Sequence, residues 1–440
     1  MFHPALLKSY LSYLDSDHRF VIGYSGGLDS HVLLHALTTI CTEQQRQQLL
    51  AIHINHSLSP DATQWSEHCI TVCNSLGVAC EIGIINANAP TKKGIEATAR
   101  TLRYEALSQH LSPGDYLLTA HQQDDQAETL LLQLLRGAGI KGLAAMPELT
   151  AFAQGYHLRP LLNFTRQELE TYAQLQQLQW IEDESNLDTR FDRNYLRQTL
   201  MPQIKQRWPA VNRTLSRTAA HCANAQLLLD QIADNSLEKA QGSAPNTLSL
   251  RYLQSLDETQ CQNVLRRWLQ QLALPLPSQI KLQQVQQEIL KCQADKNPHV
   301  QWGKVSLRRY RDNLYALPSI STIATHTQSW DLSTPLQLPG IGALTATPVI
   351  GQGIRADFFA DNQATIAFRQ TGERCQPAGR PGSHPLKKLF QEWGVPPWQR
   401  AKIPLLYCKT ELAAVIGHCI CEPFIAQKDQ PGWLISLDPS

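Results

Sequence analysis

Six residues near the start of the chain, Ser25-Gly26-Gly27-Leu28-Asp29-Ser30, have the composition of a loop that holds phosphate groups. They follow the apolar run 20–24 and precede apolar residues with helical spacing, so the sequence predicts a strand, a tight loop and a helix in succession. Two adjacent glycines allow a sharp turn and leave backbone N–H groups open to an anion, which the start of a helix favours. Ser25 and Ser30 add hydroxyl donors, and Asp29 adds a carboxylate that can hold Mg²⁺ between phosphates.

This loop differs from the G-x-x-x-x-G-K-[ST] phosphate loop, because no lysine closes it. A plain Gly-Gly turn before a capped helix would also explain a lone pair of glycines. Six matched residues between a predicted strand and a predicted helix favour the phosphate site.

A second polar segment, from His121 to Thr129, places three acids at the start of one predicted helix. Asp125 and Glu128 lie three residues apart, and Asp124 and Glu128 lie four apart, so they occupy neighbouring positions on the helix surface. Acids at a helix start can simply favour the helix dipole. Because capping needs one acid rather than three beside a histidine, we favour a site for Mg²⁺ or for the ammonium group of a cationic substrate.

A third segment is the predicted helix 94–110, in which Glu96 and Arg100 are spaced for a salt bridge and Arg103 follows one turn later. The sequence leaves two interpretations nearly even. One is a solvated salt bridge, and the other is an arginine that stabilises the charge on a phosphorus atom during transfer.

The fourth segment, residues 183–197, is a dense polar loop that leads into a basic helix with Arg193 and Arg197. Such a segment suits contacts with a nucleic-acid backbone. The alternative is a capped helix start with solvated charges.

Alternating strands and helices must position these segments. We predict strands at 20–24, 49–54, 78–85 and 116–120, and helices at 30–37, 65–76, 94–110 and 124–136. This order predicts an α/β domain with a doubly wound parallel sheet, whose ligands bind beyond the carboxyl ends of the strands. Since the glycine loop, Asn55-His56 and His121 to Asp125 each follow a strand, we expect them to converge on one nucleotide.

The 440 residues are too many for one ordinary core, so further domains are expected. We place a catalytic domain at 1–215, a helical linker at 216–236, a small mainly helical domain at 237–318 and an α+β domain at 335–440. The whole chain has a formal charge of only +1, so a polyanion must be held by a local patch. Between Arg369 and Lys409 there are eight Lys and Arg against two Glu, which makes this tail segment the candidate.

The eleven cysteines form neither a disulfide framework nor a Cys-x-x-Cys pair. We interpret Cys69 and Cys73, and also Cys419 and Cys421, as small buried hydrophobic residues rather than metal ligands. The start of the chain lacks a charged-then-apolar signal pattern, and no stretch approaches the roughly 20 apolar residues that span a bilayer. We therefore expect a cytoplasmic protein with reduced thiols and no membrane partner.

Taken together, the motifs resemble those of the bacterial tRNA(Ile)-lysidine synthetase family, within the N-type ATP pyrophosphatases. The superfamily shares the SGGxDS loop. The narrower resemblance rests on residues 53–56, 96–104, 121–129, 135–137 with 142–143, 159–162 and 183–197, and in the tail on 369–374, 386–392 and 396–400. It spans nearly the whole chain, and the tail motif is the discriminating part. Two departures are Gln122, where the family often has a second histidine, and Ser59, where an arginine is common nearby.

The resemblance implies an ATP-dependent ligase that forms a C–N bond. The C2 oxygen of the wobble cytidine of a CAU-anticodon tRNA(Ile) would attack the α-phosphorus of ATP and release pyrophosphate. The ε-amine of free L-lysine would then attack C2 and displace AMP, so that the tRNA decodes AUA. ATP, Mg²⁺, free lysine and tRNA are thus the implied cofactors and partners, and the family also suggests a homodimer.

The resemblance also implies roles for single residues. Nucleotide binding falls to Ser25, Gly26, Gly27, Leu28, Asp29, Ser30, His53, Asn55 and His121, with Asp29 as the Mg²⁺ ligand. The catalytic candidates are Asp29, Arg100, Arg103 and Asp125, and the candidates for binding lysine are Asp124, Asp125 and Glu128. The candidates for binding tRNA are Arg193, Arg197, Arg369, Arg374, Arg380, Lys387, Lys388 and Arg400. The division of labour among the three acids is left open by the sequence.

Three other functions agree less well with the residues. A tRNA thiolase of the same superfamily would usually need a cysteine pair or cluster near the active site, and Cys-x-x-Cys is absent. An amidotransferase-type ligase would need an ammonia source, but Phe2 follows Met1 where an N-terminal nucleophile would stand. A non-catalytic tRNA-binding protein is disfavoured by the intact loop and the acid cluster.

Overall fold

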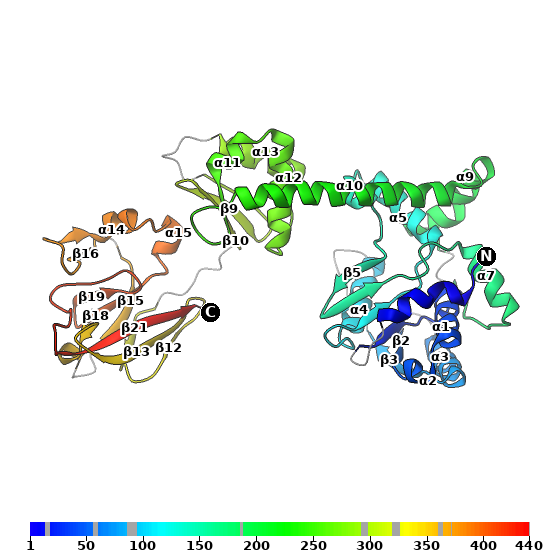
Figure 1. Cartoon of the computed structure of the whole chain (residues 1–440), viewed down its shortest axis with the longest axis horizontal. Coiled ribbons are helices and arrows are strands. Elements are labelled where there is room, and N and C mark those ends of the chain that lie inside the picture. The colour runs from blue at the N-terminus through cyan, green and yellow to red at the C-terminus, as the bar shows by residue number, and fades with distance from the viewer. Residues whose placement is uncertain are drawn as a thin grey trace. The chain divides into compact units, whose positions relative to one another are not determined.

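The computed structural model describes residues 1–13, 18–55, 60–85, 95–184, 188–291, 298–318, 326–359, 364–370 and 372–439. The chain forms two compact units, Met1–Gln231 and Ile232–Ser440. Their elements are labelled in Figure 1.

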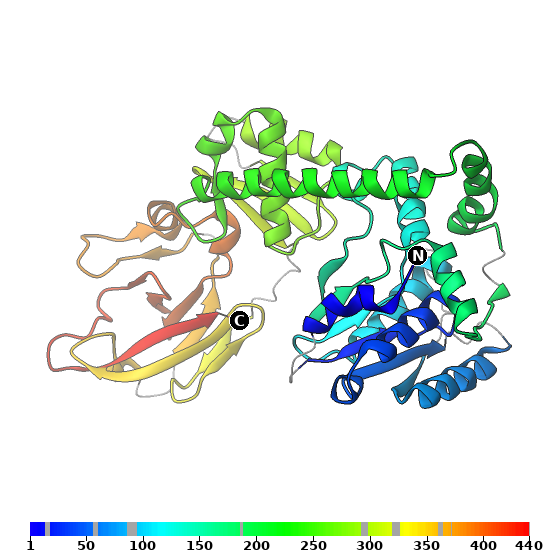
Figure 2. The same cartoon turned by 45° about the vertical axis from the view of Figure 1, so that its right-hand side comes forward.

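A six-stranded sheet in the order β3-β2-β1-β4-β6-β5 forms the centre of the first unit (Figures 1 and 2). Its strands are β1 (Phe20–Gly23), β2 (Leu49–Asn55), β3 (Ala79–Ile84), β4 (Tyr116–Leu118), β5 (Leu149–Phe152) and β6 (Gly155–Leu158). All neighbouring strands are parallel except β5, which pairs antiparallel with β6. The parallel sheet that the sequence predicts is confirmed.

Helices cover both faces of this sheet. They are η1 (Pro4–Tyr13), α1 (Leu28–Ile40), α2 (Glu43–Arg46), α3 (Ala62–Leu76), α4 (Ile95–Ser108), α5 (Gln123–Leu135), α6 (Ile140–Leu143) and α7 (Arg166–Leu175). Successive strand residues point to opposite faces. Phe20 and Ile22 therefore pack in one apolar cluster with residues of α1, α3 and α7, whereas Val21 packs in a second with Leu107 of α4. This is the doubly wound arrangement.

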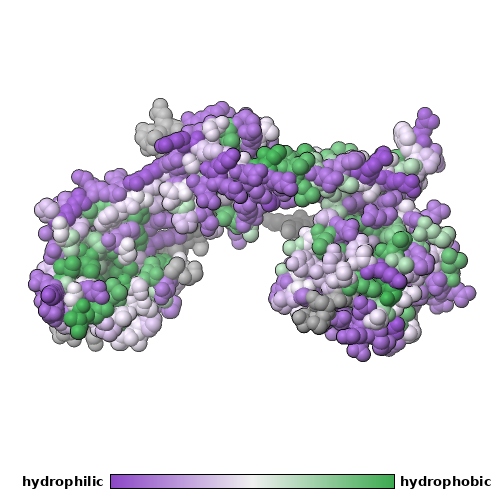
Figure 3. All heavy atoms as spheres, viewed as in Figure 1, coloured by the Kyte–Doolittle hydropathy of each residue, from purple (hydrophilic) through white to green (hydrophobic). Residues whose placement is uncertain are grey.

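Short helices and then one long helix follow the sheet. They are α8 (Asp192–Tyr195), the π-helical turn η3 (Leu196–Leu200), α9 (Met201–Arg207) and α10 (Val211–Lys239). The 29 residues of α10 include the expected linker 216–236 and the boundary between the two units. Leu227, Leu228 and Ile232 are exposed on α10, and apolar surface is visible along the middle of this helix in Figure 3. Among the helices that the structure describes, none is long and apolar enough to cross a membrane.

The second unit begins with helices that pack on an antiparallel sheet in the order β7-β10-β9-β8. The elements are β7 (Thr247–Ser249), α11 (Leu250–Ser255), α12 (Glu258–Gln271), α13 (Gln279–Gln284), η4 (Val285–Leu290), β8 (His299–Trp302), β9 (Val305–Tyr310) and β10 (Asn313–Pro318). Trp268 and Ile289 of the helices share one core with Leu307 and Leu314 of the sheet. The helices agree with the mainly helical domain expected from the sequence. Strands β9 and β10 form a hairpin, and β7 and β8 are too short to give a periodic signal.

An α+β arrangement completes the second unit, as the sequence predicts. A five-stranded sheet has the order β11-β15-β18-β19-β20, a four-stranded sheet has the order β12-β13-β21-β14, and β16 pairs with β17. The elements are β11 (Gln328–Trp330), β12 (Leu336–Leu338), β13 (Gly342–Ile350), β14 (Ile354–Arg355), η5 (Ala356–Phe359), β15 (Ala364–Phe368), β16 (Arg374–Cys375), β17 (His384–Pro385), α14 (Leu386–Glu392), α15 (Pro397–Arg400), β18 (Pro404–Cys408), β19 (Glu411–Val415), β20 (Cys419–Ile420) and β21 (Pro431–Pro439). Because β11 pairs with β15 and buries Trp330, this domain begins before the expected boundary at 335.

Trp398 joins the two parts of the second unit. Its ring lies 5.2 Å from the ring of Tyr315 and 6.2 Å from that of Tyr310, measured between centroids. The guanidinium of Arg308 lies 5.6 Å from the centroid of the same ring. Aromatic and cation–π contacts of this kind link β9 and β10 to α15.

Candidate active site at the phosphate loop

The loop between β1 and α1 has the open helix start that phosphate binding requires. Helix α1 begins at Leu28, and its N-cap, Gly27, supplies no side-chain hydrogen bond. The first N–H groups of the helix are therefore left for a ligand or for water. The hydroxyls of Ser25 and Ser30 lie 3.0 Å apart at the same place, and Ser30 donates to the Gly27 carbonyl at 2.9 Å.

Gly26 cannot be replaced without moving its neighbours. Its φ of +80° favours glycine, and a Cβ built there would lie 2.4 Å from Cδ1 of Ile181 and 3.0 Å from Sγ of Cys69. The Gly26 carbonyl also accepts a hydrogen bond from the Ile181 N–H at 3.0 Å. Ile181, about 150 residues further along the chain, thus packs against the loop and holds its backbone in place.

Asp29, in the first turn of α1, has one carboxylate oxygen in use and one free. Oδ2 pairs with Nη1 of Arg166 at 2.6 Å, whereas Oδ1 is buried and has no hydrogen-bond partner among the residues that the structure describes. Burial raises the pKa of Asp29 to about 6, with Arg166 opposing this shift and Asp125 adding to it. A buried carboxylate oxygen without a partner fits a divalent cation, which would supply the missing charge.

The three acids predicted from the sequence lie together in the first turns of α5. The Gln122 side chain accepts a hydrogen bond from the Asp124 N–H at 2.6 Å, and the Asp125 carboxylate accepts one from the Gln122 N–H at 3.0 Å. Gln122, where the family often has a histidine, therefore serves as the N-cap of the helix. Asp124 pairs with Nζ of Lys205 at 2.8 Å.

Asp125 and Glu128 are bound by two arginines of the basic segment that follows residue 188. Arg193 lies 3.0 Å from Asp125 and 2.8 Å from Glu128, and Arg197 lies 2.9 Å and 2.7 Å from the same two acids. Burial opposes the charge of Arg197, but Glu128 and Asp125 outweigh that effect and raise its pKa. The second and fourth sequence segments thus form one buried network. Arg193 and Arg197, which the sequence predicts to bind tRNA, form ion pairs with two of the acids that it predicts to bind lysine.

His121 is held by a chain of hydrogen bonds behind the carboxyl ends of β4 and β6. Arg159 Nη2 lies 2.9 Å from His157 Nδ1, His157 Nε2 lies 2.8 Å from the Thr119 hydroxyl, and that hydroxyl lies 2.7 Å from His121 Nδ1. Arginine only donates, so His157 accepts at Nδ1 and donates from Nε2 to Thr119. The same hydroxyl also hydrogen-bonds with Nδ1 of His121.

The electrostatics of this chain keep both rings neutral. Burial, followed by the charge of Arg159, lowers the pKa of His157 to about 2 and that of His121 well below its usual value. His121 is therefore neutral, and its hydrogen bond with Thr119 fixes the orientation of its ring. The sequence drew attention to His121 alone, because Thr119 and His157 carry no motif of their own.

The other predicted nucleotide residues lie near the same strand ends. Buried His53 hydrogen-bonds through Nδ1 with the Tyr24 carbonyl at 3.1 Å, and burial lowers its pKa. Asn55 donates to the Ala62 carbonyl at 3.2 Å. In α4, Arg100 is exposed and lies 5.3 Å from the ring centroid of Tyr104.

Arg103 is partly buried in α4, and burial lowers the pKa of its guanidinium. The predicted positions His56 and Ser59, residues 185–187 and the side chain of Glu96 lie outside the described part of the chain.

The basic residues of the tail domain differ in their exposure and in whether other protein groups already bind them. Arg374 donates to the Ser383 carbonyl at 2.6 Å, Arg380 pairs with Glu392 at 2.6 Å, and Arg369 lies 6.0 Å from the ring centroid of Phe390. Lys387 and Lys388 are exposed on α14. Arg400 is buried and donates from Nε to the Val395 carbonyl at 2.9 Å. Its geometry suits internal support rather than a phosphate contact.

A parallel sheet whose first strand runs into an open glycine loop, with polar residues after the neighbouring strands, defines the class of this first unit as a PP-loop domain. The family model of that description matches residues 4–204. Two further models match the second unit: the TilS substrate binding domain at residues 248–315 and the TilS substrate C-terminal domain at residues 364–437.

Curated relatives extend over the whole chain. The chain is 44% identical to the tRNA(Ile)-lysidine synthase of Coxiella burnetii, covering 100% of this chain and 97% of the relative. The enzymes of the same name from Methylococcus capsulatus (42%, covering 93% and 94%) and Photobacterium profundum (39%, covering 99% and 99%) are similarly related. The chain belongs to the tRNA(Ile)-lysidine synthase family.

A solved structure of the U34-tRNA thiolase NcsA from Methanococcus maripaludis, with its [4Fe-4S] cluster, overlaps part of the chain. The identity is 16% and the TM-score is 0.41, covering 50% of this chain and 76% of that chain. A structural similarity this low does not indicate a shared function.

Proposed function

We propose that this protein uses ATP to adenylate the C2 oxygen of the wobble cytidine of a CAU-anticodon tRNA(Ile) and then joins the ε-amine of L-lysine to C2, releasing AMP and pyrophosphate. The observation that carries the proposal is the open phosphate loop with Asp29 and the acid cluster of α5 beside it, in a chain that matches lysidine synthases from end to end. We place the reaction in the cytoplasm, where tRNA, ATP and lysine occur together.

In this proposal the nucleotide lies against the start of α1. The N–H groups of the loop and the hydroxyls of Ser25 and Ser30 bind its phosphates, and Asp29 would hold Mg²⁺ through its free oxygen. The cation neutralises phosphate charge when it is bound. Neutral His121 adds a hydrogen bond to the nucleotide, and Arg100 or Arg103 steadies negative charge on the α-phosphate. His53 and Asn55 complete the nucleotide site.

The lysine would be bound by the acid cluster. Asp124 already holds a lysine ammonium, that of Lys205, at 2.8 Å, which supports the suitability of this carboxylate for an ammonium group. Asp125 and Glu128 are fully engaged by Arg193 and Arg197, so their contribution is to fix the site and its charge. An attacking amine must be neutral, so Asp124 would also accept its proton.

The tRNA would be held by the basic residues of the tail domain, chiefly exposed Lys387 and Lys388, together with Arg369, Arg374 and Arg380. Contacts of this kind with phosphates supply affinity and register rather than base identity. We exclude Arg400 from this set because it is buried. The homodimer that the family suggests is a further prediction, which light scattering after gel filtration would test.

The proposal is tested by measuring pyrophosphate release from ATP with and without free lysine and a CAU-anticodon tRNA(Ile), together with incorporation of labelled lysine into that tRNA. We expect release to depend on the tRNA and incorporation to require all three substrates. Asp29→Asn should abolish both activities. Pyrophosphate release without lysine incorporation would contradict lysidine formation, and tRNA-independent release would point to a different acceptor.

A further inference from the structure

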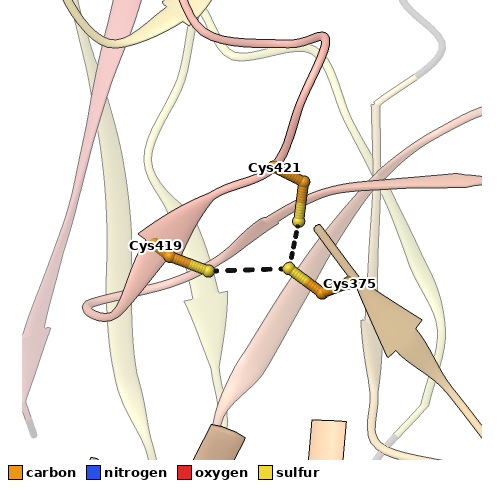
Figure 4. Close-up of side chains that lie close together, drawn as sticks. All are labelled: Cys375, Cys419 and Cys421. Carbon is orange, nitrogen blue, oxygen red and sulfur yellow. Dashed lines mark hydrogen bonds between the residues drawn. The ribbon is translucent and has the colours of Figure 1, made fainter. Parts of the chain in front are cut away.

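Three cysteines of the tail domain bring their sulfur atoms to one point (Figure 4). Cys375 belongs to β16, Cys419 to β20, and Cys421 follows β20 by one residue. The three Sγ atoms lie within 4.8 Å of one another, with Cys375 2.7 Å from Cys421 and 3.7 Å from Cys419. Among the described residues, no other three Cys, His, Asp or Glu side chains bring their ligand atoms this close.

The backbone, rather than the thiols themselves, holds these segments together. Cys419 and Cys421 are two residues apart in an extended stretch, so both can point to the same side. The Glu422 N–H donates to the Gln376 carbonyl at 2.8 Å, and the Ala378 N–H donates to the Ile420 carbonyl at 2.9 Å. A metal would therefore find the three ligands close together, and Cys375 and Cys421 would move apart by about 1 Å to take two corners of a tetrahedron around it.

We propose that Cys375, Cys419 and Cys421 form a trithiolate site for a thiophilic metal ion, with Zn²⁺ as the ion to be tested. Thiolates are the ligands that soft and borderline ions prefer, and Zn²⁺ bound by three protein groups takes water as a fourth ligand. Cys419 is partly exposed and leaves room for that water. On binding, the three thiols lose their protons to solvent, the metal keeps its charge, and no oxidation takes place.

Two simpler accounts explain less of the geometry. Small apolar packing requires no convergence of three sulfurs from two separate segments of the chain. A disulfide would use two of the sulfurs and leave the third without a role.

A metal here would stabilise the ribbon formed by β16 and β17 and hold it against the rest of the tail domain. Strands β16 and β17 pair through only Arg374–Pro385 and Cys375–His384, and two-stranded ribbons are marginal by themselves. Five of the eight residues between these strands are exposed. The ribbon carries Arg374 and Arg380 of the proposed tRNA surface, so the metal would order part of that surface. Only this last consequence rests on the proposed function.

The test measures metal binding by the full-length protein directly. Protein purified under reducing conditions is analysed for zinc, and after removal of the metal it is titrated with Co²⁺, whose thiolate charge-transfer absorption reports sulfur ligands. We expect one metal ion more per wild-type chain than in Cys375→Ser, Cys419→Ser or Cys421→Ser. The matched control is Cys408→Ser, because Cys408 is buried in the same domain but donates to the Phe358 carbonyl outside the cluster. Metal content and cobalt absorption that are the same in all variants would overturn the site.

A second measurement needs no substitution and is independent of lysidine synthesis. Removing the metal from the wild type with a chelator should increase proteolysis within residues 376–384, and Zn²⁺ should restore protection. Unchanged cleavage, or a Cys375–Cys421 disulfide found by peptide mapping of freshly reduced and repurified protein, would refute the proposal. Loss of lysidine synthesis with normal metal binding would count only against the proposed function.

Discussion

Glu128 lies at the centre of the buried network formed with Arg193 and Arg197. It is 2% exposed and receives three hydrogen bonds from Arg193 and Arg197. Glu128→Gln keeps the shape of the side chain but leaves two arginines short of a charge, and breaking a buried pair costs about 3–5 kcal/mol. We expect the lower end, about 3 kcal/mol, because the Arg197 side chain is 41% exposed. Urea unfolding of the full chain measures this loss.

The matched control for that substitution is Glu170→Gln, since Glu170 is an exposed residue of α7. Exposed substitutions usually change the free energy of unfolding by less than about 0.5 kcal/mol. Equal stability of the two variants would mean that the buried network contributes nothing to folding.

His157 makes the stability of the first unit depend on pH. Its pKa is lowered to about 2 in the folded protein, chiefly by burial, whereas in the unfolded chain it is about 6.5. Between these pH values His157 is protonated in the unfolded state but not in the folded one. The free energy of unfolding therefore falls as the pH drops below about 6.5. Between pH 7 and pH 5 this one group should remove about 2 kcal/mol.

The measurement for this prediction is urea unfolding at both pH values for the wild type and for His157→Gln. The amide of glutamine can replace both hydrogen bonds of the ring but does not titrate over this range. We expect the wild type to lose about 2 kcal/mol more than the variant on acidification. Identical losses would show that His157 is not the group responsible.

At the scale of single elements, helix α14 has the features of a phosphate-binding surface. Leu386, Leu389 and Phe390 bury one face in the core of the tail domain, while Lys387 and Lys388 are left exposed. Lys387→Glu with Lys388→Glu should weaken tRNA binding and leave ATP binding unchanged. It should also reduce the slope of log K against log salt by about 1.5, the amount expected for two phosphate contacts.

Filter binding at several salt concentrations measures both quantities. Lys428→Glu is the control, because Lys428 is exposed in the same domain but lies outside α14. Wild-type affinity and slope in the double variant would remove α14 from the tRNA surface.

Periodicity in the sequence predicted the elements that repeat a clear pattern. The buried runs of β1 and β2 and the helices α3, α4 and α5 lie within a few residues of their expected ends. Strands β7, β8 and β11 have three or four residues and, unlike β1, contain no continuous apolar run, so neither a period of two nor a buried run marks them in the sequence.

The same limit applies to the site. The loop and the acids of α5 are local in sequence and were found. Arg166, Lys205 and Ile181 are brought to them by the tertiary fold, and no local signal marks such partners. Arg193 and Arg197 were noticed, but the sequence could not show that they lie on Asp125 and Glu128.

At the scale of the whole molecule, the two compact units predict two unfolding transitions. ATP with Mg²⁺ should raise the temperature of only one transition, that of the unit with the phosphate loop. At a ligand concentration of 100 Kd the gain is about 2.7 kcal/mol. The second unit should melt as one body, since Trp398 links its two parts. Scanning calorimetry with and without nucleotide tests this, and a shift of both transitions would contradict it.

The contact between Ile181 and Gly26 has a consequence for folding during synthesis on the ribosome. Synthesis proceeds from the N-terminus, and domains fold as their residues emerge. The glycine loop is made among the first thirty residues, yet its backing residue arrives about 150 residues later, and Lys205 arrives later still. A nascent chain should therefore be unable to hold nucleotide until nearly the whole first unit has left the exit tunnel. Because these contacts join residues far apart in the sequence, we expect them to form late, and an unfinished chain should not consume ATP.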